Sequence, residues 1–194
     1  MREFKRTIYI QLELPSNLDS ALEECSRVGI KFALPKERLL AVVGTWWKTR
    51  HIAGNSIEFG SYKGATFLLL ALLSKMNNIN QKFLLLDTFE GIPIKSKYDL
   101  NRNSNEYHPK EHQDDLIRNQ ASALSIIHHI EIHKGLFSST IKELNLTQPT
   151  FAFVHIDANV YESTLEACQF AIPRISMGGQ VVFDDYNSVS DLGA

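Results

Sequence analysis

The chain has 194 residues, 44% of them hydrophobic, so it is long enough to bury the core of one domain and too short for two full ones. Its formal net charge of -2, without a basic block, argues against nucleic acid or an anionic membrane as a partner and favours a small molecule. The N-terminus lacks a sustained apolar stretch, so no signal peptide or membrane span is predicted, and the two cysteines are predicted to be free thiols in a cytoplasmic protein.

The first 50 residues predict one strand and two helices. Residues 7–14 (TIYIQLEL) alternate apolar and polar side chains, which is typical of a strand with one buried face. Residues 18–28 and 36–50 favour helices, and the second has apolar side chains at helical spacing. We therefore expect residues 1–35 to form an N-terminal strand and helix extension, and residues 36–194 to form one further domain.

From residue 55 onward, apolar strands alternate with helices. The expected strands are 55–60, 82–89, 129–135, 151–157 and 178–186, and the expected helices are 64–76, 109–127 and 161–172. Strands that are apolar almost throughout and are separated by helices indicate a parallel sheet covered on both faces. The predicted fold class is therefore a three-layer α/β sandwich, whose ligands bind at the carboxyl ends of the strands.

The first of these strands ends in a glycine-rich turn, EFGSYKGAT, that contains Glu58, Gly60 and Gly64. Glycines allow a tight turn and a close approach of the backbone to a ligand, and the following helix offers free N–H groups. The signal is weak by itself, because a strand-to-helix turn also needs small residues. The pattern lacks the G-x-G-x-x-G of dinucleotide binders, which argues against a nicotinamide enzyme.

The second strand ends in LLLDTFEG, where Asp87 is placed to accept hydrogen bonds from the two hydroxyls of a ribose. The alternative is that Asp87 caps a helix or a turn. Together with Glu58 and Gly60, it suits S-adenosylmethionine, whose ribose is free and which has no pyrophosphate.

Two later strands end in aspartates: FVHIDANV contains Asp157, and GGQVVFDDY contains Asp184 and Asp185. If these strands are neighbours, their axes lie about 4.8 Å apart, and three carboxylates crowd one cleft. Mg²⁺ or another hard divalent cation, which prefers oxygen ligands, would neutralise them. The alternative is that one or two of the aspartates cap the helix or turn that follows.

Five segments resemble successive blocks of the macrocin O-methyltransferase family: IEFGSYKGAT, LLLDTFEGIP, HKGLF, HIDANVYEST and PRISMGGQVVFDDY. The resemblance runs from about residue 38 to residue 187. It implies a Rossmann-like class I methyltransferase domain over residues 36–194 that transfers a methyl group from S-adenosylmethionine, with Mg²⁺ assistance, to a hydroxyl of a small molecule such as a sugar of a natural product. The implied site residues are Glu58, Gly60, Ser61, Gly64, Asp87 and Thr88 for the cofactor, and Asp157, Asp184 and Asp185 for the metal.

Asn159 departs from the family, which commonly has D-x-D at positions 157–159 and uses the second aspartate as a candidate general base. A neutral amide cannot accept the proton of the acceptor hydroxyl. Either another residue accepts it, or the metal alone lowers the pKa of the hydroxyl enough, or catalysis is weak. His108 and His112 are the alternative bases, and they belong to a polar stretch, residues 93–115, that forms a lid or a solvated loop. Asn159 with Glu162 also matches an N-cap and capping box. The alternative function is a cofactor-binding protein with reduced or no transfer activity.

Two further expectations concern the core and the C-terminus. His155 lies within a buried strand, so we expect a hydrogen-bonded core histidine rather than a base. Only eight residues follow Tyr186, which leaves no room for the C-terminal antiparallel strands of class I methyltransferases. Either the sequence is truncated, or the strand at residues 7–14 covers that edge; an uncovered edge favours a homo-oligomer.

Overall fold

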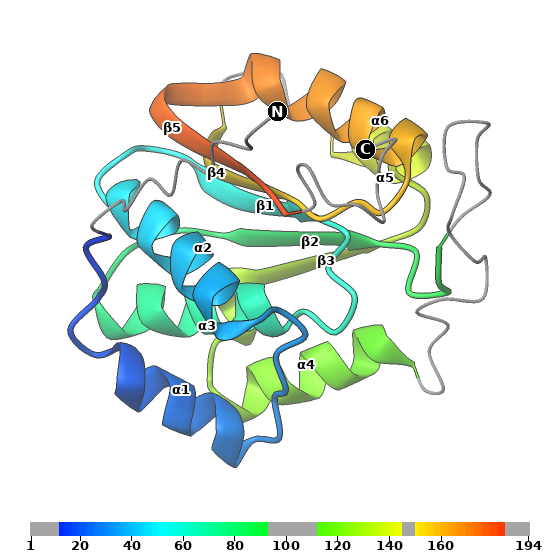
Figure 1. Ribbon diagram of the computed structural model, residues 1–194. Coiled ribbons are helices and arrows are strands. Elements are labelled where there is room, and N and C mark those ends of the chain that lie inside the picture. The colour runs from blue at the N-terminus through cyan, green and yellow to red at the C-terminus, as the bar shows by residue number, and fades with distance from the viewer. Residues whose placement is uncertain (1–11, 93–111, 145–149, 185–194) are drawn as a thin grey trace, which may run out of the picture.

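The computed structural model describes residues 12–92, 112–144 and 150–184 of the chain. Within them, one sheet of five parallel strands has the order β3-β2-β1-β4-β5 (Figure 1). The strands are β1 (Asn55–Phe59), β2 (Phe83–Asp87), β3 (Ile130–Lys134), β4 (Phe151–Ile156) and β5 (Ile175–Phe183). The predicted Rossmann-like parallel sheet is therefore confirmed, and β5 starts three residues earlier than the sequence indicates.

Helices cover both faces of the sheet (Figure 1). They are α1 (Leu18–Arg27), α2 (Lys36–Lys48), α3 (Ala65–Met76), α4 (Gln113–Ala123), α5 (Phe137–Glu143) and α6 (Tyr161–Ala171). The first four share one hydrophobic cluster with one face of the sheet, and α5 and α6 share a second cluster with the other face. The predicted three-layer sandwich is thus confirmed.

Helix α3 has the most apolar sequence of the six because it lies between the sheet and α1. The side chains of Leu68, Leu69 and Leu70 are all fully buried although they point in different directions around the helix axis. A helix that is apolar on all sides is buried on all sides. Its position explains why GATFLLLALLSKM has little helical periodicity and still forms a helix.

Two predicted elements differ from the structure. The described part of the predicted N-terminal strand, residues 12–14, is not a strand; residues 7–11 lie outside the described residues. The apolar side chains there pack on helices instead, and Leu12 contacts the backbone of α2 at Gly44 so closely that a Cβ on this glycine would lie 2.9 Å from the Leu12 Cβ. The predicted helix at 109–127 is shorter, because α4 ends at Ala123 and a 3₁₀ turn, Ile127–His129, follows.

The short helix α5 is not among the predicted elements. Its seven residues, FSSTIKE, span barely two turns and carry too few apolar positions to show a helical period. It buries Phe137 against Phe59 of β1, with ring centroids 5.2 Å apart. Tertiary packing of this aromatic pair, rather than local sequence preference, accounts for the helix.

Both cysteines lie in helices of the domain. Cys25 is buried and Cys168 is half-buried, and both are free, as predicted. Burial raises the pKa of the Cys25 thiol to about 12, so it stays protonated and behaves as a core residue. In the described parts of the chain, none of the helices is both long and apolar enough to cross a bilayer.

The strand order reverses between β1 and β4. From β1 the chain runs outward through β2 to β3, and it then returns to the other side of β1 with β4 and β5. In open parallel sheets this point forms a crevice at the carboxyl ends of the strands, where ligands bind. The topology therefore places Glu58, Asp87, Asp157 and Asp184 around one crevice, as expected from their positions at strand ends.

Candidate active site

A pocket of about 1260 Å³ lies at this strand-order reversal. The ends of β1, β2, β4 and β5 all contribute residues to its lining, and so does the segment that leads into α2. Small-molecule sites usually measure about 300–1,000 Å³. The volume therefore leaves room for a nucleoside-sized cofactor and a second molecule beside it.

The glycine turn after β1 brings the ends of β1 and β4 into direct contact. Gly60 has φ +91°, and a Cβ added to it would lie 2.1 Å from the carbonyl oxygen of Asp157. Gly64, the N-cap residue of α3, has φ +66°, and a Cβ there would meet Leu85 at 2.9 Å. Both positions need glycine for the backbone conformation and for the space. The close approach at Gly60 is thus to the protein's own backbone, and the cofactor-binding role of both glycines stays a prediction.

Asp87 joins the turn after β1 to the turn after β2. Its Oδ2 accepts a hydrogen bond from the backbone N–H of Tyr62 at 2.7 Å, and its Oδ1 accepts one from that of Phe89 at 2.7 Å. Tyr62 and Phe89 have φ of 48° and 53°, a strained backbone conformation that these bonds hold in place. Burial raises the pKa of the Asp87 carboxyl, and the two N–H donors oppose that rise.

The turn-cap alternative for Asp87 is therefore correct as a structural role, and it does not exclude ribose binding. Each carboxylate oxygen has two lone pairs, so Asp87 can still accept bonds from hydroxyls on its pocket side. Its neighbour Thr88 donates its hydroxyl to the carbonyl of Gly91 at 2.8 Å, and it also lines the pocket.

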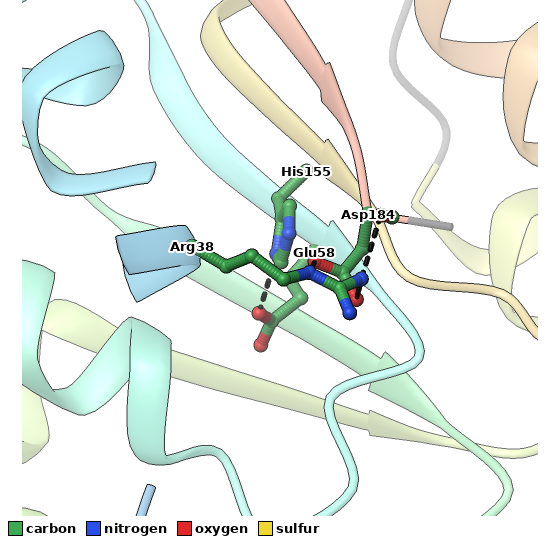
Figure 2. A network of polar contacts seen from close by, with 4 residues as sticks. All are labelled: Arg38, Glu58, His155 and Asp184. Carbon is green, nitrogen blue, oxygen red and sulfur yellow. Dashed lines mark hydrogen bonds and ion pairs between the residues drawn. The ribbon is translucent and has the colours of Figure 1, made fainter. Parts of the chain in front are cut away.

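Glu58 and His155 form a buried pair beneath the pocket (Figure 2). Glu58 is 2% exposed, His155 is fully buried, and Glu58 Oε1 lies 2.9 Å from His155 Nδ1. The two residues are register partners on β1 and β4. The prediction that His155 is a hydrogen-bonded core histidine is confirmed.

Burial and mutual contact shift the pKa values of both members of this pair. Burial raises the pKa of the Glu58 carboxyl, although the hydrogen bond with His155 lowers it. For His155, burial disfavours the imidazolium, yet the hydrogen bond and charge of Glu58, together with the charges of Asp157 and Asp184, raise its pKa. Both pKa values are therefore raised above their ordinary values, and the two side chains share a hydrogen bond between Nδ1 and Oε1.

Two buried polar atoms beside the pocket have no partner at regular hydrogen-bond geometry among the described residues, although the two side chains that carry them interact with each other. They are Glu58 Oε2 and the hydroxyl of Ser61, which is 6% exposed. Unpaired buried oxygens are rare in folded proteins because each forfeits its hydrogen bonds to water. Since Glu58 and Ser61 line the pocket, they fit a ligand that brings N–H donors, such as the ammonium group of an amino-acid moiety.

The ends of β4 and β5 are adjacent, so the condition for bringing the two aspartate motifs together is met. The N–H of Asp157 donates to Phe59 O at 2.9 Å, and that of Asp184 donates to Ile156 O at 3.0 Å. Asp157, Asn159 and Asp184 all line the pocket. Asp185, the third predicted metal ligand, lies outside the described residues.

Arg38 is the site residue that the sequence interpretation missed. From the first turn of α2 it reaches Asp184: its Nε donates to Oδ1 at 3.0 Å, one Nη donates to the backbone carbonyl at 2.6 Å, and the same Nη contacts Oδ2 (Figure 2). The side chain of Asp184 is 7% exposed and that of Arg38 is 42% exposed. A positional signal existed, because a helix that precedes a parallel strand begins at the carboxyl edge of the sheet.

The donors fit a divalent cation in chemical type, but they are not assembled around one. Asp157, Asp184 and the Asn159 carbonyl supply the hard oxygen atoms that Mg²⁺ prefers. Among residues 12–92, 112–144 and 150–184, however, no group of three or more His, Cys, Asp or Glu is placed to hold a metal. Both carboxylate oxygens of Asp184 are already bonded to Arg38, so the metal site stays a prediction.

The N-cap alternative for Asn159 is wrong. The N-cap residue of α6 is Val160, and no side chain caps this helix. The turn is instead held by Thr164, whose hydroxyl donates to Ala158 O at 2.9 Å. Asn159 is thus in the pocket lining without a capping role that would explain an asparagine there.

Of the two predicted histidine bases, only His112 is among the described residues, and it is not part of the pocket lining. His112 is the exposed N-cap residue of α4, and its neighbour Gln113, rather than His112 itself, is part of the pocket lining. His108 lies outside the described residues, as does most of the predicted lid.

Known proteins match both the sequence and the fold. The sequence profile of the family described as Macrocin-O-methyltransferase (TylF) matches residues 38–193. Demethyldecarbamoylnovobiocin O-methyltransferase from Streptomyces niveus is 23% identical over 145 residues. The 8-demethyl-8-(2,3-dimethoxy-alpha-L-rhamnosyl)-tetracenomycin-C 4'-O-methyltransferase from Streptomyces olivaceus is 26% identical over 145 residues. Each match covers 70% of this chain and 54% of the relative, so the chain spans about half the length of these relatives.

Among solved structures, that of CalS11, a calicheamicin methyltransferase, matches with a TM-score of 0.71 and 17% sequence identity. The match covers 93% of this chain and 82% of that one. Another structure with this fold, at a TM-score of 0.52, is an O-methyltransferase in complex with S-adenosylmethionine. At these identities the structures establish the fold, and the family profile establishes the relationship.

Proposed function

The chain belongs to the macrocin O-methyltransferase family, and from that premise we propose that its pocket transfers a methyl group from S-adenosylmethionine to a hydroxyl of a small molecule. The observation that carries the proposal is the arrangement of one pocket. Buried side-chain oxygens of Glu58 and Ser61 lie on its β1 side, and the oxygen atoms of Asp157, Asn159 and Asp184 lie on its β4 and β5 side.

The β1 and β2 side is proposed to hold the cofactor. Glu58 Oε2 and Ser61 Oγ accept from the ammonium group of the methionine part, and Asp87 and Thr88 bind the ribose hydroxyls. Gly60 and Gly64 shape the turn that carries these groups. The support is local: hydrogen bonds hold Glu58, Asp87 and Thr88 in place before any ligand binds, which lowers the entropic cost of binding.

The β4 and β5 side is proposed to orient the acceptor. The acceptor oxygen attacks the methyl carbon, the bond from that carbon to sulfur breaks, and S-adenosylhomocysteine leaves while the hydroxyl proton passes to a base or to water. Holding the two reactants in line supplies much of the rate acceleration in such transfers. Asp157, Asp184 and Asp185 are proposed to hold Mg²⁺, and a bound cation lowers the pKa of a hydroxyl oxygen bonded to it.

The acceptor class follows from the relatives and stays a proposal. One curated relative is named for a rhamnosyl 4'-O-methyl transfer, which supports a sugar hydroxyl of a glycosylated natural product.

A second candidate function is a cofactor-binding protein with reduced or no transfer. Two observations favour it: Asn159 cannot accept a proton, and Arg38 occupies the carboxylate of Asp184.

Two measurements separate these functions. Calorimetric titration with S-adenosylhomocysteine tests the cofactor site, and conversion of S-adenosylmethionine with a panel of glycosylated and phenolic acceptors tests transfer. Binding with transfer supports the enzyme. Binding without transfer across the panel favours the second candidate, and absence of binding refutes both.

A further inference from the structure

The contact between Arg38 and Asp184 places a cationic group where the proposed function places a metal ion. A guanidinium binds a carboxylate through two parallel hydrogen bonds, a geometry that engages both oxygens. Here Nε donates to Oδ1, one Nη donates to Oδ2, and that Nη also donates to the backbone carbonyl of Asp184 (Figure 2). A divalent cation bound by Asp184 would need the same carboxylate lone pairs.

Burial makes this contact costly to break without a replacement. The Asp184 side chain is 7% exposed, whereas that of Arg38 is 42% exposed. Loss of Arg38 would leave a nearly buried carboxylate beside Asp157, without the counter-charge that now neutralises it. Arg38, which is nearly half exposed, can turn into solvent at a smaller cost. The arrangement therefore favours either the guanidinium or another cation at Asp184, and it disfavours an empty carboxylate.

Arg38 is also attached to one wall of the pocket. Lys31, Leu34 and Pro35, which precede α2, line the pocket together with Arg38. Helix α2 is anchored by buried Leu39 and Trp46, so the helix body is held while its first turn faces the cleft. Arg38 can thus exchange partners through its side chain while α2 stays in place.

We propose that Arg38 is a resident counter-ion that competes with a divalent cation for Asp184, so that cation binding requires Arg38 to release this carboxylate. The inference rests on the proposed cation site. In this inference, Arg38 determines whether Asp184 is bonded to a guanidinium group or to a metal ion. In the Arg38-bound state the strand-end carboxylate is neutralised without offering an open coordination position to an acceptor oxygen.

The test is a calorimetric titration of the protein with Mn²⁺ or Mg²⁺ alone, which measures the affinity for the cation. Arg38→Gln removes the charge and keeps much of the side-chain length, and it should bind the cation about ten- to a hundred-fold more tightly than wild type, as expected for removal of a charge-assisted hydrogen-bonded competitor. Arg38→Lys, which keeps the charge without the two-pronged geometry, should lie between them. Arg27→Gln is the matched control, because Arg27 forms an exposed pair with Glu24 on α1, and its cation affinity should equal that of wild type.

A stability measurement tests the same competition independently. Without metal, Arg38→Gln should unfold at a lower urea concentration than wild type, because Asp184 loses its partner. Saturating Mg²⁺ should close that gap, since a ligand that binds the folded state stabilises it by mass action. Arg27→Gln should show no such metal-dependent recovery.

The failure modes are distinct. If wild type binds the cation and Arg38→Gln binds it no more tightly, the competition is refuted and the proposed cation site stands. If neither protein binds a cation, the inference and the cation part of the proposed function both fall. Titration with S-adenosylhomocysteine then still decides the cofactor part by itself.

Discussion

The two sides of the pocket differ in how they are built. On the β1 and β2 side, Glu58, Gly60 and Asp87 are held by contacts within the sheet and its turns, including the two N–H bonds to Asp87 and the His155 contact of Glu58. On the β4 and β5 side, Asp184 depends on Arg38, a residue 146 positions away in the sequence. The polar groups of the first side are held within the fold, whereas the proposed cation at Asp184 would have to displace a bonded partner.

Under the proposed function, the groups that bind the cofactor are therefore preorganised, whereas the groups that hold the metal and the acceptor are not. Binding groups that are preorganised cost little to order when the ligand arrives. On the β4 and β5 side, Arg38 already neutralises Asp184, so each proposed cation that binds must first replace Arg38.

Gly60→Ala should be the most damaging change on the preorganised side. The added Cβ would lie 2.1 Å from the carbonyl oxygen of Asp157, in a backbone conformation of φ +91°. We expect a loss of about 4 kcal/mol or more in unfolding free energy by urea denaturation, because neither backbone can move without disturbing the sheet.

Gly29→Ala is the matched control for that variant. Gly29 has φ +80° but no atom within 4 Å of an added Cβ, so it carries the backbone strain alone and should cost about 1–2 kcal/mol. Equal losses in the two variants would show that strain, rather than contact between the ends of β1 and β4, determines the need for glycine at position 60.

Asn159→Asp tests the reacting side. This substitution removes no helix cap, because Asn159 does not cap α6. If the missing carboxylate limits catalysis, methyl transfer should rise by about 100-fold, the contribution typical of a positioned general base. Product formation with the acceptor panel measures it. An unchanged rate would mean that proton removal does not limit transfer, and Asn159→Ala serves as the control for altered packing.

Asp87→Ala tests the link between the two turns on the cofactor side. Affinity for S-adenosylhomocysteine should fall by about 1–3 kcal/mol, because a charged acceptor for the ribose hydroxyls is lost. Stability should fall as well, since the N–H groups of Tyr62 and Phe89 lose their partner. Unaltered affinity in calorimetry would restrict Asp87 to its role in the turns.

The buried Glu58–His155 pair should make stability depend on pH. The pKa of His155 is raised above 6.5 in the folded protein, so the folded state holds a proton that the unfolded state releases. Its stabilisation is complete below pH 6.5 and is lost as pH rises through the folded pKa, with a limiting slope of about 1.4 kcal/mol per pH unit for one proton.

Urea denaturation from pH 6 to pH 9 measures this slope. Glu58→Gln removes the carboxylate that raises the pKa of His155, so the slope should shrink, whereas His51→Gln, at an exposed histidine, should leave it unchanged. A wild-type unfolding free energy that stays level over this range would contradict proton retention by the pair.

Local patterns predicted most of the sheet. The apolar runs that end in Asp87 and Asp157 are strands within one or two residues of the expected bounds, because strand burial imprints a continuous apolar run on the sequence. The alternation at residues 7–14 misled, because the described residues 12–14 are not a strand and Leu12 contacts α2 at Gly44. Alternation reports that one face of an extended segment is buried, but it does not report what buries it.

The candidate site was partly predictable for a related reason. Strand ends are visible in the sequence, so the carboxylates of Asp87, Asp157 and Asp184 could be assigned to one crevice from the alternation of strands and helices. The start of the helix before β1 could place Arg38 at the same edge of the sheet, but no local pattern distinguishes a solvated arginine there from one that contacts Asp184. The capping-box pattern at Asn159 also misled, because the turn is held by Thr164 instead.

The sequence by itself determined the alternation of strands and helices, the glycines of the first turn and the acidic residues at the strand ends. These follow from backbone geometry, which repeats every two residues in a strand and every 3.6 in a helix and therefore leaves a local pattern. Only the tertiary structure decided the strand order β3-β2-β1-β4-β5, the buried contact of Glu58 with His155, and the pairing of Arg38 with Asp184. The two side-chain contacts join residues that are separated by 97 and 146 positions in the sequence. Such distant contacts depend on how the layers pack on one another, and a local sequence period does not report that packing.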